Sequence, residues 1–346
     1  MAQNSVVLIC GEQEDGKITA ITKELLGIGK MLAGGLNGKL SALIIGSGIR
    51  DSGEEAIVYG ADNVYLVDDP LLSQYNPDSY TTAITQACQQ IGPSVVLLGH
   101  TTMGRDVAGR VAFRLGCFPF MNCINLNIDP DSKSLVQTRS VYGGNAIAVV
   151  VSKDSQPQLA TIKLRAMTPL EPDSSRKGEI ENIKVTIDNS AIRTKLVSTT
   201  KEEVEGINLE DAKVIIAGGG GIGDAEGFQL LQDFAKIFGG AVGTTTVPYD
   251  EGWVPTTSMV IGDSGKTVKP DLYIAVGIRG ASQHIAGCSE SKLIVAINKD
   301  SDAGMFKLSD LGVVADYRQV LPPLIEKCKN EHRTSNVQHR ILNVKT

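Results

Sequence analysis

Short apolar runs alternate with stretches of helical periodicity through the first half of the chain. The apolar runs have the length of strands and lie at residues 5–10, 41–46, 63–69 and 93–99. The helical stretches lie at residues 18–35, 54–61, 80–92 and 103–116. Short apolar strands that alternate with helices are typical of a parallel sheet covered by helices on both faces. The pattern therefore predicts an α/β domain.

The pattern changes after Pro119. Residues 134–152 read as two strands around a Gly-Gly turn and residues 158–166 as a third, which we interpret as a β extension of the first domain. Residues 168–210 carry many charges, prolines and turn formers, which predicts a linker with some extended pairing in its middle. An N-terminal α/β domain with a β extension is therefore expected at residues 1–200.

The α/β alternation starts again in the second half. Strand-like runs lie at residues 212–221, 240–247, 272–277, 292–300 and 311–316. Helical patterns lie at residues 225–239 and 320–330. We therefore predict a second α/β domain at residues 201–330, again with a mainly parallel sheet and flanking helices. Residues 331–346 are polar, which predicts a peripheral C-terminal tail.

Composition and charge narrow the class of protein. Hydrophobic residues make up 42% and charged residues 21% of the 346 positions, as in globular proteins. The net charge of −6 argues against a nucleic-acid-binding surface. No segment has the ~18–20 uninterrupted apolar residues of a membrane span, and the first residues do not resemble a signal peptide. These features predict a soluble, cytoplasmic protein.

The six cysteines are scattered along the chain without C-x-x-C spacing. No zinc or iron–sulfur site can be assembled from that spacing, so no metal site is predicted. The cysteines are expected to be buried free thiols in a protein of a reducing compartment.

A glycine-rich loop at residues 218–223 fits G-x-G-x-x-G, follows a strand and opens a helix. That context suits a dinucleotide pyrophosphate at a helix N-terminus. The NAD-binding form also needs an acidic residue at the end of the next strand, which here ends in Thr244, Thr245 and Thr246. A simple NAD-binding reading therefore fails, and a tight turn that needs backbone room remains an alternative.

Four further polar or glycine-rich segments follow or adjoin predicted strands. They are the loop at residues 262–267, the turn at 277–287 with His284, residues 298–300 and Asp316. The loop at 262–267 lacks the spacing of a P-loop, so a nucleoside triphosphatase is not predicted. Open α/β sheets bind ligands at the carboxyl ends of their strands, and five such loops together indicate a binding site there. On spacing alone, a lone histidine in a helix is more often a hydrogen-bonded core or surface residue than a ligand contact, so His284 keeps that alternative role.

The order of these segments resembles the α subunit of electron transfer flavoprotein. GIRGASQHIAGC at residues 277–288 is similar to the family's GISGAIQHLAGM, and AINKD occurs unchanged at residues 296–300. Residues 263–268 are similar to the family's QTGKxV loop. In the first half, MGRDVAGRVA at residues 103–112 resembles IGRDLxPRVA, and YGGNAIA at residues 142–148 resembles GGNxxA. The resemblance covers the chain up to about residue 330.

The resemblance implies a function and a fold. Such subunits bind FAD in a C-terminal domain related to the NAD-binding domain of deoxyhypusine synthase. Their N-terminal domain binds a β subunit, and the heterodimer carries electrons from an acyl-CoA or related flavin dehydrogenase. The residues that the resemblance places at FAD are Gly220, Thr245, Thr246, Ile261, Gly262, Asp263, Ser264, Gly265, Arg279, Gly280, Ala281, Ser282, Gln283, His284, Asn298, Asp316 and Tyr317.

The resemblance also implies roles for some of these residues. His284 corresponds to the residue beside the flavin C2 carbonyl, where a donor stabilises negative charge on the reduced ring. Ser264 corresponds to a threonine that reaches the N5 side, and Gln283 belongs to the loop around the flavin. Asn298 and Asp316 correspond to contacts on the adenosine side.

Three positions depart from the family pattern. Family arginines are replaced by Gly220 and Thr246, and a family serine is replaced by Arg279. We hypothesise that Arg279 supplies the positive charge at the flavin edge that Thr246 does not. Orientation of Arg279 toward solvent or a partner subunit is the alternative.

The leading functional prediction is an electron carrier subunit with no substrate turnover of its own and no catalytic residue. Two alternatives stay open. One is a wiring and docking subunit of a stable dehydrogenase complex, including one that bifurcates electrons. The other is a relic that has lost FAD, since two family arginines are missing. An NAD-dependent oxidoreductase is disfavoured because no catalytic acid–base pair stands out.

Overall fold

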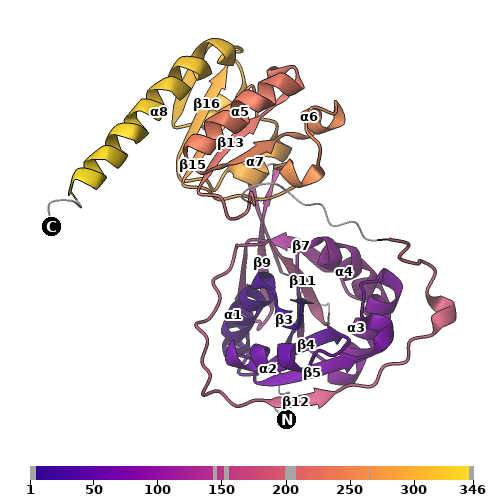
Figure 1. Cartoon of the computed structure of the whole chain (residues 1–346). Coiled ribbons are helices and arrows are strands. Elements are labelled where there is room, and N and C mark those ends of the chain that lie inside the picture. The colour runs from indigo at the N-terminus through magenta and orange to yellow at the C-terminus, as the bar shows by residue number, and fades with distance from the viewer. Residues whose placement is uncertain (1–4, 143–145, 152–155, 199–207, 264, 343–346) are drawn as a thin grey trace. The chain divides into compact units, whose positions relative to one another are not determined.

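The chain divides into two compact α/β units, and each is described here by itself. A computed structural model describes residues 5–142, 146–151, 156–198, 208–263 and 265–342, with the backbone alone for residues 191 and 331–342. The first unit comprises residues 1–141 and 145–199, and the second comprises residues 142–144 and 200–346. Figure 1 shows the first unit in indigo to pink and the second in orange to yellow.

The first unit is built on a seven-stranded sheet in the order β12-β5-β4-β1-β6-β11-β7, and all its pairings are parallel. These strands are β1 (Val6–Gly11), β4 (Lys39–Gly46), β5 (Asn63–Asp68), β6 (Val95–Gly99), β7 (Pro119–Cys123), β11 (Gln158–Ile162) and β12 (Glu179–Asn182). A short hairpin joins β2 (Gln13–Glu14) and β3 (Lys17–Ile18). The predicted parallel sheet of the first half is confirmed.

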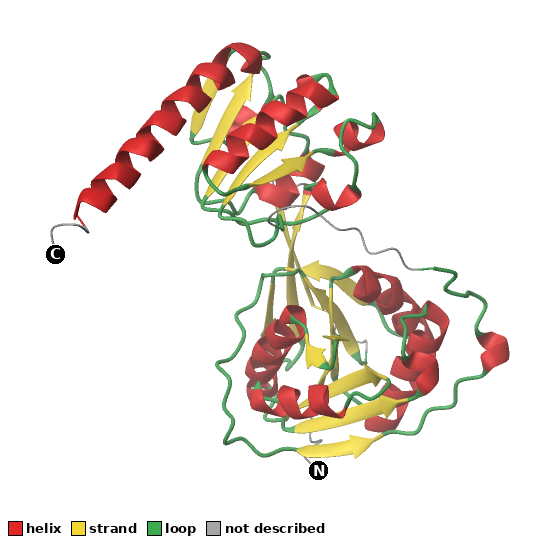
Figure 2. Ribbon diagram, in the orientation of Figure 1, coloured by secondary structure: helices red, strands yellow, loops and turns green. Residues whose placement is uncertain are grey.

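Helices cover both faces of this sheet, as Figure 2 shows. The helices are α1 (Ala20–Gly35), α2 (Arg50–Val58), α3 (Pro77–Ile91) and α4 (Thr102–Leu115). Alternate residues of β1 point to opposite faces, so Val7 and Ile9 pack with α1 and α2 while Leu8 and Cys10 pack with α3 and α4. Burial on both faces explains why the strands read as unbroken apolar runs.

The predicted β extension is a three-stranded antiparallel sheet in the order β10-β9-β8. Its strands are β8 (Asn125–Ile128), β9 (Leu135–Val141) and β10 (Ala146–Val151). The strand predicted at residues 158–166 does not belong to it. Because all five residues of β11 are buried, this strand instead joins the main sheet between β6 and β7.

The second unit is built on a five-stranded parallel sheet in the order β14-β13-β15-β16-β17. Its strands are β13 (Val214–Gly218), β14 (Ala241–Thr244), β15 (Leu272–Val276), β16 (Ile294–Asn298) and β17 (Leu311–Val314). Its helices are α5 (Ala225–Ile237), α6 (Thr246–Asp250), α7 (Ser282–Cys288) and α8 (Tyr317–Leu342). One core packs the sheet against α5 and α8, and the other packs it against the loops around α7. The predicted α/β class is confirmed for both halves.

Two boundaries in the second unit differ from the sequence prediction. The strand predicted at residues 240–247 ends at Thr244, and α6 begins at Thr246. The predicted polar tail is helical through residue 342, because α8 continues past residue 330.

All six cysteines are free thiols. No helix in the described part of the chain combines the length and apolar character needed to cross a bilayer.

Candidate functional site

The strand-end loops of the second unit lie along one edge of its sheet. The strand register aligns Thr244, Gly218, Val276, Ile297 and Val313 in one row across the five strands. Every predicted site residue from Gly220 to Tyr317 comes after one of these row residues in the chain, and Asn298, directly after Ile297, is still the last residue of β16. At about 4.8 Å between neighbouring strands, four spacings span roughly 19 Å, which is enough for an extended dinucleotide. The site is therefore the carboxyl edge of a parallel sheet.

Two of the loops pack backbone against backbone. The Gly219 amide donates to the Val276 carbonyl at 2.9 Å, and the Gly221 amide donates to the Gly277 carbonyl at 2.9 Å. A Cβ at Gly221 would lie 2.8 Å from the Cα of Gly277. Contact between the loops thus explains several glycines that the sequence had suggested for phosphate binding.

Gly220 differs from its neighbours because it is exposed. A Cβ there would meet only the Val247 side chain, at 3.4 Å. The outer face of this turn is open to a ligand, and a Cβ could be added there without a backbone clash.

The loop at residues 261–265 is tied to α7. The Asp263 amide donates to the Gln283 carbonyl at 2.7 Å. Gly262 has φ 151°, and a Cβ there would lie 2.9 Å from the same carbonyl oxygen. Gly265 closes a tight turn by donating to the Gly262 carbonyl at 3.1 Å. Ser264 lies outside the described residues, so its predicted role stays a prediction.

His284 points into the core of the second unit and is 5% exposed. Its Nδ1 lies 2.9 Å from the Ile261 carbonyl oxygen, and its Nε2 lies 2.9 Å from the Tyr273 hydroxyl. A carbonyl oxygen only accepts, so Nδ1 carries the proton and Nε2 accepts from Tyr273. Both ring nitrogens thus have partners inside the protein. In this arrangement the imidazole holds the 261–265 loop against α7, and it has no free N–H for the predicted donation to flavin.

Burial also lowers the pKa of His284 below its ordinary value of 6.5, and the bond to Ile261 opposes that shift in part. The folded state therefore favours the neutral ring, whereas the unfolded state takes up a proton below pH about 6.5. We expect the free energy of unfolding of the second unit to fall as the pH drops from about 6.5 through the lowered pKa. Urea titrations between pH 5 and 8 measure it. A His284→Gln variant should depend less on pH in this range, and equal slopes would contradict the assignment.

Two other residues that were predicted to contact FAD also make their hydrogen bonds within the protein. Asn298 donates through Nδ2 to the Ile278 carbonyl at 2.9 Å and accepts from the Asp300 amide at 3.1 Å. Tyr317 is 6% exposed, and its hydroxyl donates to the Ile222 carbonyl at 2.9 Å. These side chains shape the loops around the edge. Asp316 is exposed at the same edge.

Among the remaining predicted residues that the structure describes, Ile261 and Gly262 are buried, whereas the others lie toward solvent along the row. The exposed ones are Thr246, Asp263, Gly265, Arg279, Ala281, Ser282 and Gln283, and Thr245 and Gly280 are partly exposed. The Arg279 side chain has no hydrogen-bond or ion-pair partner among the described residues. Its carbonyl accepts from the Met305 amide at 3.1 Å, which fixes the backbone of the turn. Arg279 is therefore an unpaired cation beside the open edge in the part of the chain that the structure describes.

Sequence reasoning missed Tyr273, the partner of His284. This tyrosine is fully buried in the middle of the apolar run LYIAV. A phenol inside an otherwise aliphatic buried strand needs a hydrogen-bond partner, and that requirement was the available signal.

Comparisons with known proteins match both units of the chain to domains of one family. Residues 7–188 match the electron transfer flavoprotein domain, and residues 208–289 match the electron transfer flavoprotein FAD-binding domain. The α subunit of electron transfer flavoprotein from Thermoanaerobacterium thermosaccharolyticum is 41% identical over 323 residues, covering 93% of this chain and 97% of the relative. That of Megasphaera elsdenii is 38% identical, covering 96% and 98%. Protein FixB of Clostridium saccharobutylicum is 37% identical, covering 93% and 96%.

The fold and these matches define a two-domain flavoprotein whose second domain is of the FAD-binding type. The chain belongs to the family of electron transfer flavoprotein α subunits. FAD is accordingly its cofactor. The residues present fit that group, since the edge offers an open glycine turn at Gly220, exposed polar side chains and the unpaired Arg279.

Proposed function

We propose that this chain is the FAD-binding half of an α/β heterodimer that carries electrons in the cytoplasm. It would pass them between an acyl-CoA or related flavin dehydrogenase and a downstream acceptor. The observation that carries the proposal is the row of open loops along the carboxyl edge of the second sheet. The relatives that are named as α subunits support a β subunit as the constant partner.

The chain's own residues would bind and orient FAD. The open turn at Gly220 and the polar groups from Thr245 to Gln283 line the edge that receives it. Arg279 offers positive charge, and the fixed His284 keeps the 261–265 loop in place. FAD supplies the redox chemistry when bound. We find no catalytic acid–base pair among the described residues of this edge, which supports an electron carrier rather than an enzyme with its own substrate.

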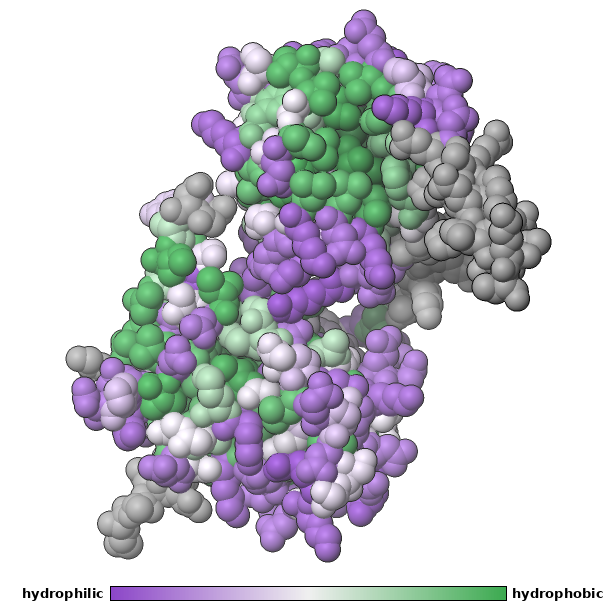
Figure 3. Space-filling view, turned by 90° about the vertical axis from the view of Figure 1, so that its left-hand side faces the viewer, coloured by the Kyte–Doolittle hydropathy of each residue, from purple (hydrophilic) through white to green (hydrophobic). Residues whose placement is uncertain are grey.

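Two exposed apolar surfaces support the proposal that a β subunit binds this chain. On β10, Ile147 and Val149 are 62% and 61% exposed. On the edge strand β17, Leu311 and Val314 are 59% and 60% exposed. Figure 3 shows apolar surface over a broad area of the upper body, which is the second unit. Exposed apolar strands at sheet edges are typical of surfaces that another chain covers.

Purification together with a β subunit tests this function. We expect a yellow heterodimer with a flavin absorption spectrum and FAD bound to this chain, reduced by a flavin dehydrogenase with its substrate. A colourless protein that takes up no added FAD would support the relic instead. A third protein that stays bound through purification would favour the docking subunit of a dehydrogenase complex.

Arg279→Ser is expected to lower the flavin potentials by a few tens of millivolts. Loss of a nearby positive charge destabilises the electron-rich reduced ring, and 59 mV corresponds to a tenfold change in a one-electron equilibrium. Redox titration of the heterodimer measures the shift. Arg279→Lys, which keeps the charge, should stay close to the original chain. If the serine variant titrates like the original, Arg279 does not act on the flavin.

A further inference from the structure

A second, unassigned site lies on the outer face of α3 and α4 in the first unit. An open hollow of about 350 Å³ is lined by Asp78, Gly109, Arg110, Phe113, Arg114 and Arg193, with Thr81 beside them. Gly109 contributes no side chain, and a Cβ there would meet nothing within 4 Å. The hollow lies in the unit that does not carry the FAD edge.

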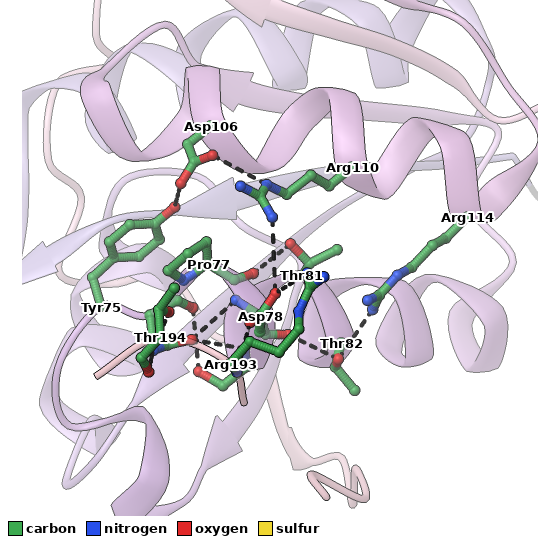
Figure 4. Close-up of polar contacts among 12 residues, drawn as sticks. Tyr75, Pro77, Asp78, Thr81, Thr82, Asp106, Arg110, Arg114, Arg193 and Thr194 are labelled. Atoms are coloured by element: carbon green, nitrogen blue, oxygen red, sulfur yellow. Dashed lines mark hydrogen bonds and ion pairs between the residues drawn. The ribbon is translucent and has the colours of Figure 1, made fainter. Parts of the chain in front are cut away.

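Three guanidinium groups reach this hollow, two from α4 and one from the loop that passes α3. Figure 4 shows the Arg110 guanidinium between Asp106 and Asp78, with Arg193 also directed at Asp78. Arg110 donates through Nε to Asp106 at 3.1 Å, and its Nη1 lies 3.8 Å from Asp78. Arg193 donates to Asp78 twice, from its backbone amide and from Nη2, each at 3.0 Å. These contacts hold two of the three arginines in fixed positions.

The acidic residues do not neutralise the cluster. Asp78 and Asp106 face Arg110, Arg114 and Arg193, which leaves one net positive charge. Asp78 stays ionised because hydrogen bonds from Arg193 lower its pKa. Among the described residues, Arg114 has no carboxylate partner and donates only to the Thr82 hydroxyl, at 3.0 Å. The guanidinium of Arg114 is therefore the cation that an incoming anion would neutralise.

Most donors of the cluster are free for a ligand. A guanidinium group has five N–H donors in a planar fork, and the hydrogen bonds above use one on each arginine side chain. Such forks favour the several oxygens of a phosphate group, which accept from more than one arginine at a time. Phe113 at the rim is 86% exposed, and nothing in the described chain covers its ring.

We propose that this hollow binds the phosphate or pyrophosphate group of a small organic phosphate, with the rest of that molecule packed on Phe113. The rim ring suits a planar or apolar moiety, since aromatic faces pack on heterocycles and acyl chains. The site is separate from the FAD edge and does not depend on the proposed electron transfer.

Calorimetric titration of the FAD-loaded heterodimer with inorganic pyrophosphate and with AMP tests the proposal. We expect saturable binding of both that weakens as salt is raised. Arg114→Gln should lower the affinity for both by about tenfold or more, since it removes the cation without a carboxylate partner. Phe113→Ala should weaken the binding of AMP but leave the binding of pyrophosphate unchanged. This difference separates the ring contact from the phosphate contact.

Arg50→Gln is the matched control. Arg50 is an exposed arginine of α2 that pairs with Glu54, so the variant changes the net charge of the same unit by the same amount. An equal loss in Arg50→Gln and Arg114→Gln would show non-specific attraction and overturn the site. Binding that is unaffected by Arg114→Gln would place the phosphate elsewhere and overturn it as well. If neither phosphate compound binds and electron transfer is slower in Arg114→Gln, the proposal is overturned. The hollow would then be a contact surface for an acidic protein partner.

Discussion

Gly280→Ala is expected to lower the free energy of unfolding of the second unit by about 2–4 kcal/mol and to weaken FAD binding. Gly280 has φ 88°, a backbone conformation that costs an alanine roughly 1–2 kcal/mol. A Cβ there would also overlap the backbone nitrogen of Met305, which cannot move without breaking its hydrogen bond to Arg279. Denaturant titration and FAD titration of the purified chain measure the two effects.

Gly220→Ala is the matched control for this substitution. Gly220 lies in the strand-end loop that follows β13, but its added Cβ finds only Val247 at an ordinary contact distance of 3.4 Å. We expect a change in stability within about 0.5 kcal/mol for this variant. Similar losses in both variants would mean that the turn at Gly280 is not constrained by Met305.

Val149→Asp is expected to weaken association with the β subunit by a factor of about 100 or more. Val149 lies on β10 and is 61% exposed in the single chain, so a partner that covers this strand would bury the new carboxylate without a counter-charge. The fold of the chain should be retained because the site faces solvent before assembly. Sedimentation velocity of mixtures with the β subunit measures the loss.

Val197→Asp provides the comparison. Val197 is 91% exposed and lies in the segment before the second unit, outside the strand surfaces argued to bind the partner. The same chemical change there should leave association within about twofold of the original. If Val149→Asp assembles as well as Val197→Asp, β10 is not part of the interface.

The sequence predicted elements well wherever strands are buried on both faces. The runs at β1, β4, β6, β13 and β15 are unbroken apolar stretches, because both faces of each strand pack against other elements. The strand predicted at residues 240–247 is too long, because threonines are favoured both in strands and at the start of helices. Thr245 takes the N-cap position of α6 in the structure.

Less of the candidate site than of the fold could be predicted from the sequence. The location at the strand ends follows from the α/β pattern, and the family motifs supply the residues. The direction of each side chain does not follow from either. His284, Asn298 and Tyr317 were predicted to contact the cofactor, yet their polar groups bond to Ile261, Ile278 and Ile222, which lie 20 or more positions away along the chain.

The sequence by itself determined the two α/β halves, the glycine-rich strand ends and the family. Local periodicity and turn chemistry encode those features, since each depends on neighbours a few positions away. Only the tertiary structure decided that Gly221 packs on Gly277, that His284 is buried between Tyr273 and Ile261, and that Arg110 and Arg193 meet at Asp78. These outcomes depend on burial and on partners distant in the chain, which no local pattern specifies.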